Sequence, residues 1–208
     1  MLHIKTVEPS TFAVLKRLMD IPEMKAFHLV GGTALSLMYG HRISVDLDMF
    51  STTKFENSII STALAKEFGE GFVADESKPF FGIFCYINDL KVDIVPYPHP
   101  LIRPTLAVEG IRMVSMEDIV AMKVQAVLGQ AKKKDFWDIA ELLKHFTVDD
   151  FIKFHKEKFA TQNLFITVPQ AISYFADADD SEDPVCLKNQ TWGSVKAEIQ
   201  KKIADFLK

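Results

Sequence analysis

The stretch Leu29-Val-Gly-Gly-Thr-Ala-Leu-Ser-Leu-Met-Tyr-Gly-His-Arg-Ile-Ser-Val-Asp-Leu-Asp-Met-Phe50 decides the fold. Its pattern predicts a short strand over residues 26–30, a helix over 33–39 and a strictly alternating strand over 44–50. Between the first strand and the helix stands the glycine pair Gly31-Gly32, followed by Thr33. Glycines there let the backbone approach a ligand closely, and the exposed amides of a helix start favour phosphate.

Two aspartates stand in the second of these strands. Alternation places Val45, Leu47 and Met49 on one face and Asp46 and Asp48 on the other. Alternate residues of a strand lie about 6.6 Å apart, so the two carboxylates can converge, and they repel each other unless a cation separates them. Oxygen ligands of this kind suit Mg²⁺ beside substrate phosphates. The alternative is a half-exposed strand with two solvated acids.

A third acid, Asp93, stands in a later strand candidate at residues 91–95. Its side chain is expected on the same face as Lys91, opposite Val92 and Ile94. There it would complete a three-carboxylate cluster that holds two metal ions for an in-line phosphoryl or nucleotidyl transfer. The alternative is a Lys91–Asp93 ion pair on an exposed face.

A lysine stands in the middle of the apolar face of the helix predicted over residues 116–128. Lys123 falls within the stripe of Met116, Ile119 and Val120, whereas other polar residues occupy a separate side. The stem of Lys123 could reach past the apolar surface to water, but an anionic partner in a cleft explains its position better.

The next predicted helix, residues 135–146, carries Asp135 over its apolar stripe and Asp138 at the edge of that stripe. An aspartate at a helix start is commonly an N-cap, which suits Asp135 better than Asp138. The preceding lysines, 132–134, form either a solvated loop or a basic lip that steers a nucleotide or an RNA backbone. Arg42 is placed to bind a phosphate or to pair with an acid.

Strand and helix signals alternate in the first half of the chain, and helical signals alone remain in the second. Further strands are expected at 71–75 and 80–87, with a hairpin turn at Asn88-Asp89. The other expected elements are a helix capped by Ser10, helices at 56–68, 149–159, 163–175 and 194–207, and an acidic loop at 177–183. The predicted class is α/β (α+β), a mixed sheet flanked by helices over 1–114 and a helical region over 115–208 that completes the cleft.

Composition bounds the class of protein. The chain has 208 residues, 48% of them hydrophobic and 25% charged, which indicates a globular core rather than disorder. The net charge of −4 excludes a histone-like polycation but not a local basic site. Two cysteines, Cys85 and Cys186, are too few for a disulfide framework or a zinc cluster. No signal peptide or membrane span is evident, so a cytoplasmic location is expected, and no spacing indicates covalent catalysis.

The opening run, followed by Met122-Lys-Val-Gln-Ala126 and by Lys134-Asp-Phe-Trp-Asp-Ile139, resembles the AbiEii/AbiGii toxin family. The resemblance covers about residues 27–143 in the family's order. It implies a nucleotidyltransferase-like fold and, as in many members, the toxin half of a bacterial toxin–antitoxin system.

The resemblance also assigns roles to residues. Gly32 and Thr33, with Gly31 beside them, match the family's position at the nucleotide phosphates. Asp46 and Asp48 match its metal-binding pair. Asp93 lies where related nucleotidyltransferases carry a third carboxylate, so it joins the expected metal-binding and catalytic residues.

The later motifs complete the expected site. Lys123 matches the lysine that holds the triphosphate, and Asp135, with Asp138 nearby, matches an acid placed as a catalytic base. Arg42 and Asp138 are expected at the nucleotide as well. Family members often carry an arginine about five residues before the Lys-Asp pair, where this chain has Gln130. Loss of that cation would weaken phosphate binding or alter the choice of nucleotide.

The function implied is Mg²⁺-dependent transfer of a nucleoside monophosphate from a nucleoside triphosphate, with Mn²⁺ as the other candidate metal. RNA, tRNA in particular, is the expected acceptor, and an antitoxin is the expected protein partner. Two alternatives remain: an antibiotic-type small molecule as acceptor, and a nucleotide-binding or regulatory module without turnover. Gln130 favours the second alternative slightly, and the intact Asp-x-Asp pair opposes it.

Overall fold

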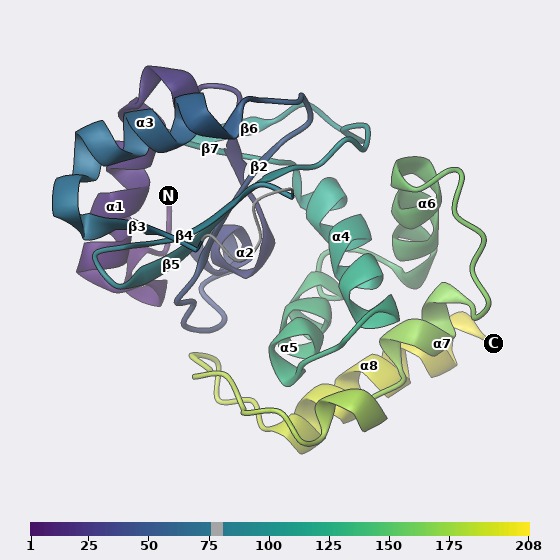
Figure 1. The fold of residues 1–208 in the computed structure, drawn as a ribbon. Coiled ribbons are helices and arrows are strands. Elements are labelled where there is room, and N and C mark those ends of the chain that lie inside the picture. Colours follow the sequence, from purple (N-terminus) through teal and green to yellow (C-terminus); the bar gives the residue numbers. More distant parts are fainter. Residues whose placement is uncertain (76–80) are drawn as a thin grey trace.

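The computed structural model describes residues 1–75 and 81–208, and within these residues a mixed seven-stranded sheet forms the centre of the fold (Figure 1). The strand order is β3-β4-β5-β2-β1-β7-β6. Strands β2 and β5 are parallel, as are β1 and β7, and the other neighbouring pairs are antiparallel. The strands are β1 (His28–Leu29), β2 (Leu47–Ser51), β3 (Phe72–Ala74), β4 (Ile83–Ile87), β5 (Leu90–Pro96), β6 (Leu106–Val108) and β7 (Ile111–Met113).

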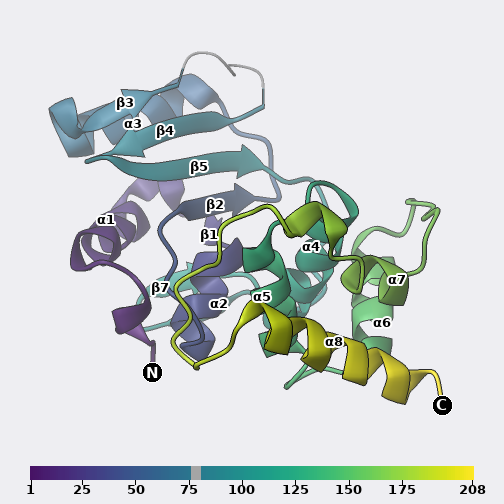
Figure 2. The same cartoon turned by 90° about the horizontal axis from the view of Figure 1, so that it is seen from below.

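Helices cover both faces of this sheet. Helices α1 (Pro9–Asp20) and α3 (Asn57–Phe68) lie on one face, and α2 (Gly31–Tyr39) lies on the other (Figure 2). Helix α2 contacts α4 (Met116–Leu128) and α5 (Lys133–Leu142), which join the sheet to the helical half. The remaining helices are α6 (Val148–Lys158), α7 (Val168–Ile172) and α8 (Trp192–Phe206), with short 3₁₀ turns at Ile4–Thr6, Pro22–Met24, Gly69–Gly71 and Ala176–Ala178. No helix in the described residues combines the length and apolarity needed to span a membrane.

The expected α/β architecture is confirmed, with the glycine pair and the acidic strand on neighbouring strands. Strand β1 is adjacent to β2, as expected from the single helix between them, and the pair is antiparallel. Leu47 and Met49 of β2 are fully buried, whereas Asp48 and Phe50 point to the opposite face, toward α4. The alternation of β2 therefore separates the core from a polar face.

The start of this strand differs from the prediction. Strand β2 begins at Leu47, so Asp46 lies just outside it, and Val45 is 62% exposed instead of sharing the buried face. The reason is that the backbone before Leu47 bonds to a 3₁₀ turn and to helix α2 rather than to the sheet. The amide of Ser44 donates to the carbonyl of Thr6, and the carbonyl of Asp46 accepts from the Thr33 hydroxyl.

The hairpin between β4 and β5 is confirmed. Asn88 and Asp89 have φ values of 49° and 65°, the positive values that a two-residue type I′ turn needs. The preceding strand was expected over 80–87 and runs over Ile83–Ile87, while residue 80 lies outside the described residues. On its other side β5 pairs in parallel with β2, and the register of that pair puts Asp93 of β5 directly beside Asp48 of β2.

Three elements of the sequence prediction were wrong. Ser10 does not cap the first helix, because α1 already begins at Pro9, after the N-cap residue Glu8. The hairpin β6–β7 was not predicted, because strands of three residues are too short to show alternation. The single helix expected over 163–175 is reduced to α7, capped by Thr167. Pro169 stands in the first turn of α7, and a proline is tolerated only there, so a helix could not continue through it from residue 163.

Candidate functional site

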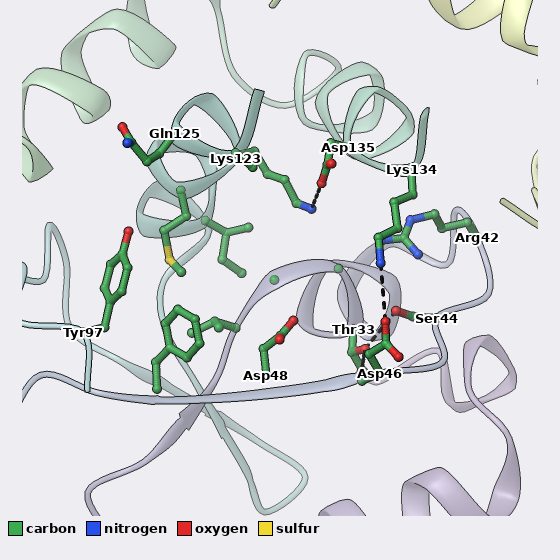
Figure 3. A pocket seen from close by; sticks show the side chains of 17 residues that line it. Thr33, Arg42, Ser44, Asp46, Asp48, Tyr97, Lys123, Gln125, Lys134 and Asp135 are labelled. Atoms are coloured by element: carbon green, nitrogen blue, oxygen red, sulfur yellow. Dashed lines mark hydrogen bonds and ion pairs between the residues drawn. The ribbon is translucent and has the colours of Figure 1, made fainter. Parts of the chain in front are cut away.

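A cavity of about 340 Å³ lies between the polar face of β2 and helix α4 (Figure 3). Charged side chains gather at one end of it, and aromatic and aliphatic side chains line the rest. The residues expected at the site from the sequence that line this cavity are Gly31, Gly32, Thr33, Arg42, Asp46, Asp48, Lys123 and Asp135. Asp93 and Asp138 do not line it.

The two glycines at the start of α2 leave room for charged side chains. Gly31 has a φ of +69°, and a Cβ atom there would lie 2.8 Å from Oδ2 of Asp48. A Cβ atom on Gly32 would lie 2.0 Å from Nη2 of Arg42. Among the described residues, no side chain caps the first turn of α2, so its amides remain available at the cavity.

Replacing Gly32 with alanine is expected to lower the free energy of unfolding by about 1–3 kcal/mol, because the added methyl group displaces the Arg42 guanidinium. Chemical denaturation measures this loss. Gly193→Ala is the matched control, since a Cβ there meets nothing closer than 3.9 Å and alanine suits helix α8. Equal stabilities for the two variants would contradict the proposed crowding at Gly32.

Asp46 is held by its backbone and by one lysine. The Thr33 hydroxyl donates to the Asp46 carbonyl and lies 2.9 Å from the Ser44 hydroxyl. Lys134 Nζ lies 3.4 Å from Oδ2 of Asp46. Thr33 is nearly fully buried, and it lines the cavity. Its bond to the Asp46 carbonyl orients the segment that carries Asp46.

Asp48 and Asp93 are neighbours on adjacent parallel strands. Burial, and then the charge of Asp93, raise the pKa of Asp48. Lys91 Nζ lies 2.6 Å from Oδ2 of Asp93, the ion pair considered from the sequence, while Oδ1 of Asp93 is buried with no hydrogen-bond partner in the described residues.

The three carboxylates expected at the metal do not all line the cavity. Within residues 1–75 and 81–208, no group of three or more His, Cys, Asp or Glu side chains is arranged to hold a metal ion. Asp46 stands beyond the end of β2 and faces Lys134, while Asp93 pairs with Lys91. The cavity therefore has two carboxylates of the three, Asp46 and Asp48.

A buried ion network explains the misplaced charges on α4 and α5. Asp138 is fully buried and accepts from Arg42 at 2.7 and 2.9 Å and from His41 Nε2 at 2.7 Å. Lys123 Nζ lies 2.6 Å from Oδ2 of Asp138 and 2.9 Å from Oδ1 of Asp135. Lys123 thus pairs with two carboxylates of its own chain, whereas its place on the apolar face predicted an anionic partner in a cleft.

The buried ion network holds the charged groups of Arg42 and Lys123 in place at the wall of the cavity. Burial alone would raise the pKa of Asp138, but the charges of Arg42 and Lys123 hold it well below its usual value. Asp138 contacts both cations from behind without lining the cavity, so it acts as a positioning residue. Asp135 does reach the cavity and also accepts from the Lys132 amide at 3.1 Å, which stabilises the start of α5.

A second cavity of about 540 Å³ adjoins the first. Asp46, Lys134, Arg42 and Ser44 line both cavities. Its far wall comes from the acidic loop near the other end of the sequence, with Asp180, Glu182 and Asp183.

That loop continues into a segment that is bonded to the cation-bearing stretch. The Ile43 amide donates to the Val185 carbonyl, and the Leu187 amide donates to the His41 carbonyl, both at 2.9 Å. These bonds pair residues 185–187 antiparallel with residues 41–43, with a bridge between Arg42 and Cys186.

Sequence reasoning missed the residues at the end of the cavity remote from the charges. Tyr97 and Gln125 stand there, and Phe50 and Met122 form part of the wall (Figure 3). Two signals could have found them. Tyr97 continues the alternation of Asp93 along its strand, and Gln125 stands three residues after Met122 on the same helix.

The family model that describes the nucleotidyl transferase AbiEii toxin of type IV toxin–antitoxin systems matches residues 13–206. The chain belongs to this family. The AbiEii match spans both the sheet and the helical half, including α6 to α8, where the sequence carries no recognised motif. The protein is accordingly a nucleotidyltransferase.

Other similarities agree with the AbiEii assignment. An uncharacterised protein of Aquifex aeolicus (strain VF5), aq_aa25, is 27% identical over 201 residues, which are 93% of this chain and 94% of that protein. The crystal structure of JHP933 from Helicobacter pylori is similar with a TM-score of 0.58 at 21% identity, covering 97% of this chain and 89% of that one. MenT4, the nucleotidyltransferase toxin Rv2826c of Mycobacterium tuberculosis H37Rv, has a TM-score of 0.59 at 12% identity, covering 92% and 81%. These structures share the fold.

Proposed function

We propose that this protein transfers a nucleoside monophosphate from a nucleoside triphosphate to a hydroxyl group of RNA, such as tRNA, with Mg²⁺, and acts as a toxin that an antitoxin partner restrains. The observation that carries the proposal is the convergence of three carboxylates, two buried cations and an uncapped helix start on one cavity of the described chain. Anionic phosphates and a divalent cation are the ligands that these groups suit together.

The phosphates are proposed to bind at the start of α2. The amides of Gly31 and Gly32 have no side-chain cap from the described residues, and helix α2 adds the positive end of its dipole. Lys123 and Arg42 add positive charge at the same cavity, held in place by Asp138. Lys123 and Arg42 would neutralise charge that builds on the phosphates during transfer.

The carboxylates fit a hard divalent cation. Asp46 and Asp48 offer oxygen donors to the cavity, and the raised pKa of Asp48 reflects its burial and the charge of Asp93 beside it. Oδ1 of Asp93, buried and without a partner in the described residues, is a further oxygen beside Asp48. Asp46 and Asp48, with Asp93 assisting, are proposed to hold Mg²⁺ or Mn²⁺. Such an ion polarises phosphoryl oxygens when bound.

Asp135 is proposed to orient or deprotonate the acceptor hydroxyl. In the reaction the acceptor oxygen bonds to the α-phosphorus, the α–β phosphoanhydride bond breaks and pyrophosphate leaves. The acceptor proton passes to a carboxylate such as Asp135, which lines the cavity and is fixed by Lys123 and the Lys132 amide. This side chain is only 12% exposed, so its orientation is restricted.

The second cavity is the proposed place of the acceptor, because it meets the first at Asp46 and Lys134. Lys132 and Lys134 suit an RNA backbone. The acidic wall at Asp180, Glu182 and Asp183 suits a cationic small molecule instead, and this observation keeps an antibiotic-type acceptor as a second candidate.

A transfer assay tests both candidates. The protein is incubated with each labelled nucleoside triphosphate and Mg²⁺, and with either total tRNA or a panel of polyamine and aminoglycoside acceptors. Label on tRNA supports the RNA proposal, and label only on a cationic small molecule supports the second candidate. Omitting the divalent ion or adding a chelator is expected to stop transfer. Nucleotide binding without transfer to any acceptor would overturn the proposed reaction.

A further inference from the structure

Lys134 stands where the two cavities meet, and it lines both of them. Its side chain extends from the start of α5 to Asp46, and its Nζ lies 3.4 Å from Oδ2 of that residue (Figure 3). Asp46 belongs to the aspartate pair that is proposed to hold a divalent cation. Lys134 and that cation therefore require the same carboxylate.

The two lysines before Lys134 have other surroundings. Lys133 Nζ lies 2.9 Å from Oδ1 of Asp183, and the Lys133 amide donates to the Ser181 hydroxyl at 2.9 Å. Lys132 lines the second cavity but not the first. Among the residues that the structure describes, Lys134 is the only one whose side chain forms an ion pair with Asp46. Of the three lysines, Lys134 alone is thus placed to act at both cavities.

The pair of Lys134 and Asp46 is weak, and the lysine is its movable member. The two side chains are 45% and 32% exposed, so water screens their attraction. The Asp46 carbonyl accepts from the buried Thr33 hydroxyl, which holds the backbone of Asp46, whereas Lys134 reaches Asp46 through a long flexible stem. A divalent cation on Asp46 would repel the ammonium and would therefore displace Lys134 rather than Asp46.

The displaced ammonium has the second cavity beside it, which is the proposed place of the acceptor. While Asp46 neutralises Lys134, the acidic wall of that cavity opposes an RNA backbone. Once the cation neutralises Asp46 instead, the charge of Lys134 becomes available to a phosphate. We propose that Lys134 couples the two sites: it pairs with Asp46 until a divalent cation binds, and it then contacts the phosphate backbone of the RNA acceptor. This coupling rests on the proposed function.

The first test measures binding of Mn²⁺ alone to the full-length protein by electron paramagnetic resonance, without nucleotide. Lys134→Gln removes the competing cation, so it is expected to bind Mn²⁺ about twofold to fivefold more tightly than the wild-type protein. General damage to the site would weaken binding instead. Lys132→Gln is the matched control, because it removes the same charge from the second cavity without breaking a pair with Asp46, and its Mn²⁺ affinity is expected to stay close to that of the wild-type protein. Equal tightening in both variants would overturn the displacement of Lys134.

The second test measures binding of a short fluorescein-labelled single-stranded RNA at fixed monovalent salt, with either Mn²⁺ or a chelator and without nucleotide. Mn²⁺ is expected to raise the RNA affinity of the wild-type protein, and this gain is expected to be about twofold to fivefold smaller in Lys134→Gln. Lys132→Gln is expected to weaken RNA binding by the same factor with and without Mn²⁺, so it keeps the wild-type gain.

The two tests separate failure of the coupling from failure of the proposed function. A gain from Mn²⁺ that is the same in Lys134→Gln and in the wild-type protein would overturn the coupling alone. Wild-type protein that binds no Mn²⁺ would overturn the proposed metal site, and protein that binds Mn²⁺ but no RNA under either condition would overturn the proposed RNA acceptor.

Discussion

Replacing Asp48 with asparagine is expected to reduce nucleotidyl transfer by on the order of 1,000-fold or more, equivalent to at least about 4 kcal/mol of transition-state stabilisation. Asp48 lies beside Gly31 and directly opposite Asp93 on the neighbouring strand, and asparagine offers a neutral, weaker ligand for a divalent cation. Initial rates of label transfer from a nucleoside triphosphate, at saturating Mg²⁺, measure the loss.

The same variant is expected to fold at least as well as the wild-type protein. The raised pKa of Asp48 means that its buried charge opposes folding at neutral pH, so asparagine removes that cost. Asp149→Asn, the same change on an exposed residue of α6, is the control and should leave transfer unchanged. Transfer that survives in Asp48→Asn would show that the metal assignment is wrong.

Replacing Asp138 with asparagine is expected to lower the free energy of unfolding by about 3–5 kcal/mol at pH 7. The change leaves Arg42 and Lys123 buried without their shared carboxylate, and it disturbs the His41 contact. Urea unfolding monitored by tryptophan fluorescence measures the loss. Glu141→Gln on the same helix is the matched control, because the lysine partners of Glu141 are partly exposed, and about 1 kcal/mol or less is expected.

The Asp138 effect has a defined pH dependence. The folded protein holds the pKa of Asp138 well below 3.8, so its contribution to stability is complete above about pH 4 and declines as the pH falls toward that lowered pKa. The stability difference between wild-type protein and Asp138→Asn should therefore be constant from pH 5 to 8 and shrink below pH 4. A difference that grows with acidity would contradict the assignment of a buried, ionised Asp138.

Much of the site could be predicted from the sequence because its residues break local rules. Lys123 occupies a position on an apolar helix face where solvation is poor, and a buried lysine needs a carboxylate partner. Gly31 and Gly32 are fixed by contacts too close for any side chain. These requirements concern a few neighbouring residues, so they are visible in the local sequence pattern.

Other features of the site depend on long-range contacts that no local pattern records. Whether Asp93 meets Asp46 depends on where β2 begins, and just before that point the Asp46 carbonyl accepts from the distant Thr33 hydroxyl. The pairing of Gln125 with His155 joins two helices through side chains alone. Strand β7 lies beside β1 although its three residues carry no strand signal, because its position is determined by pairing across the sheet.

The pairing of residues 41–43 with residues 185–187 has a consequence for the order in which contacts form during synthesis. The ribosome makes His41 and Arg42 well before their backbone partners at Val185 and Leu187. These backbone contacts can therefore form only after the intervening helices have been made.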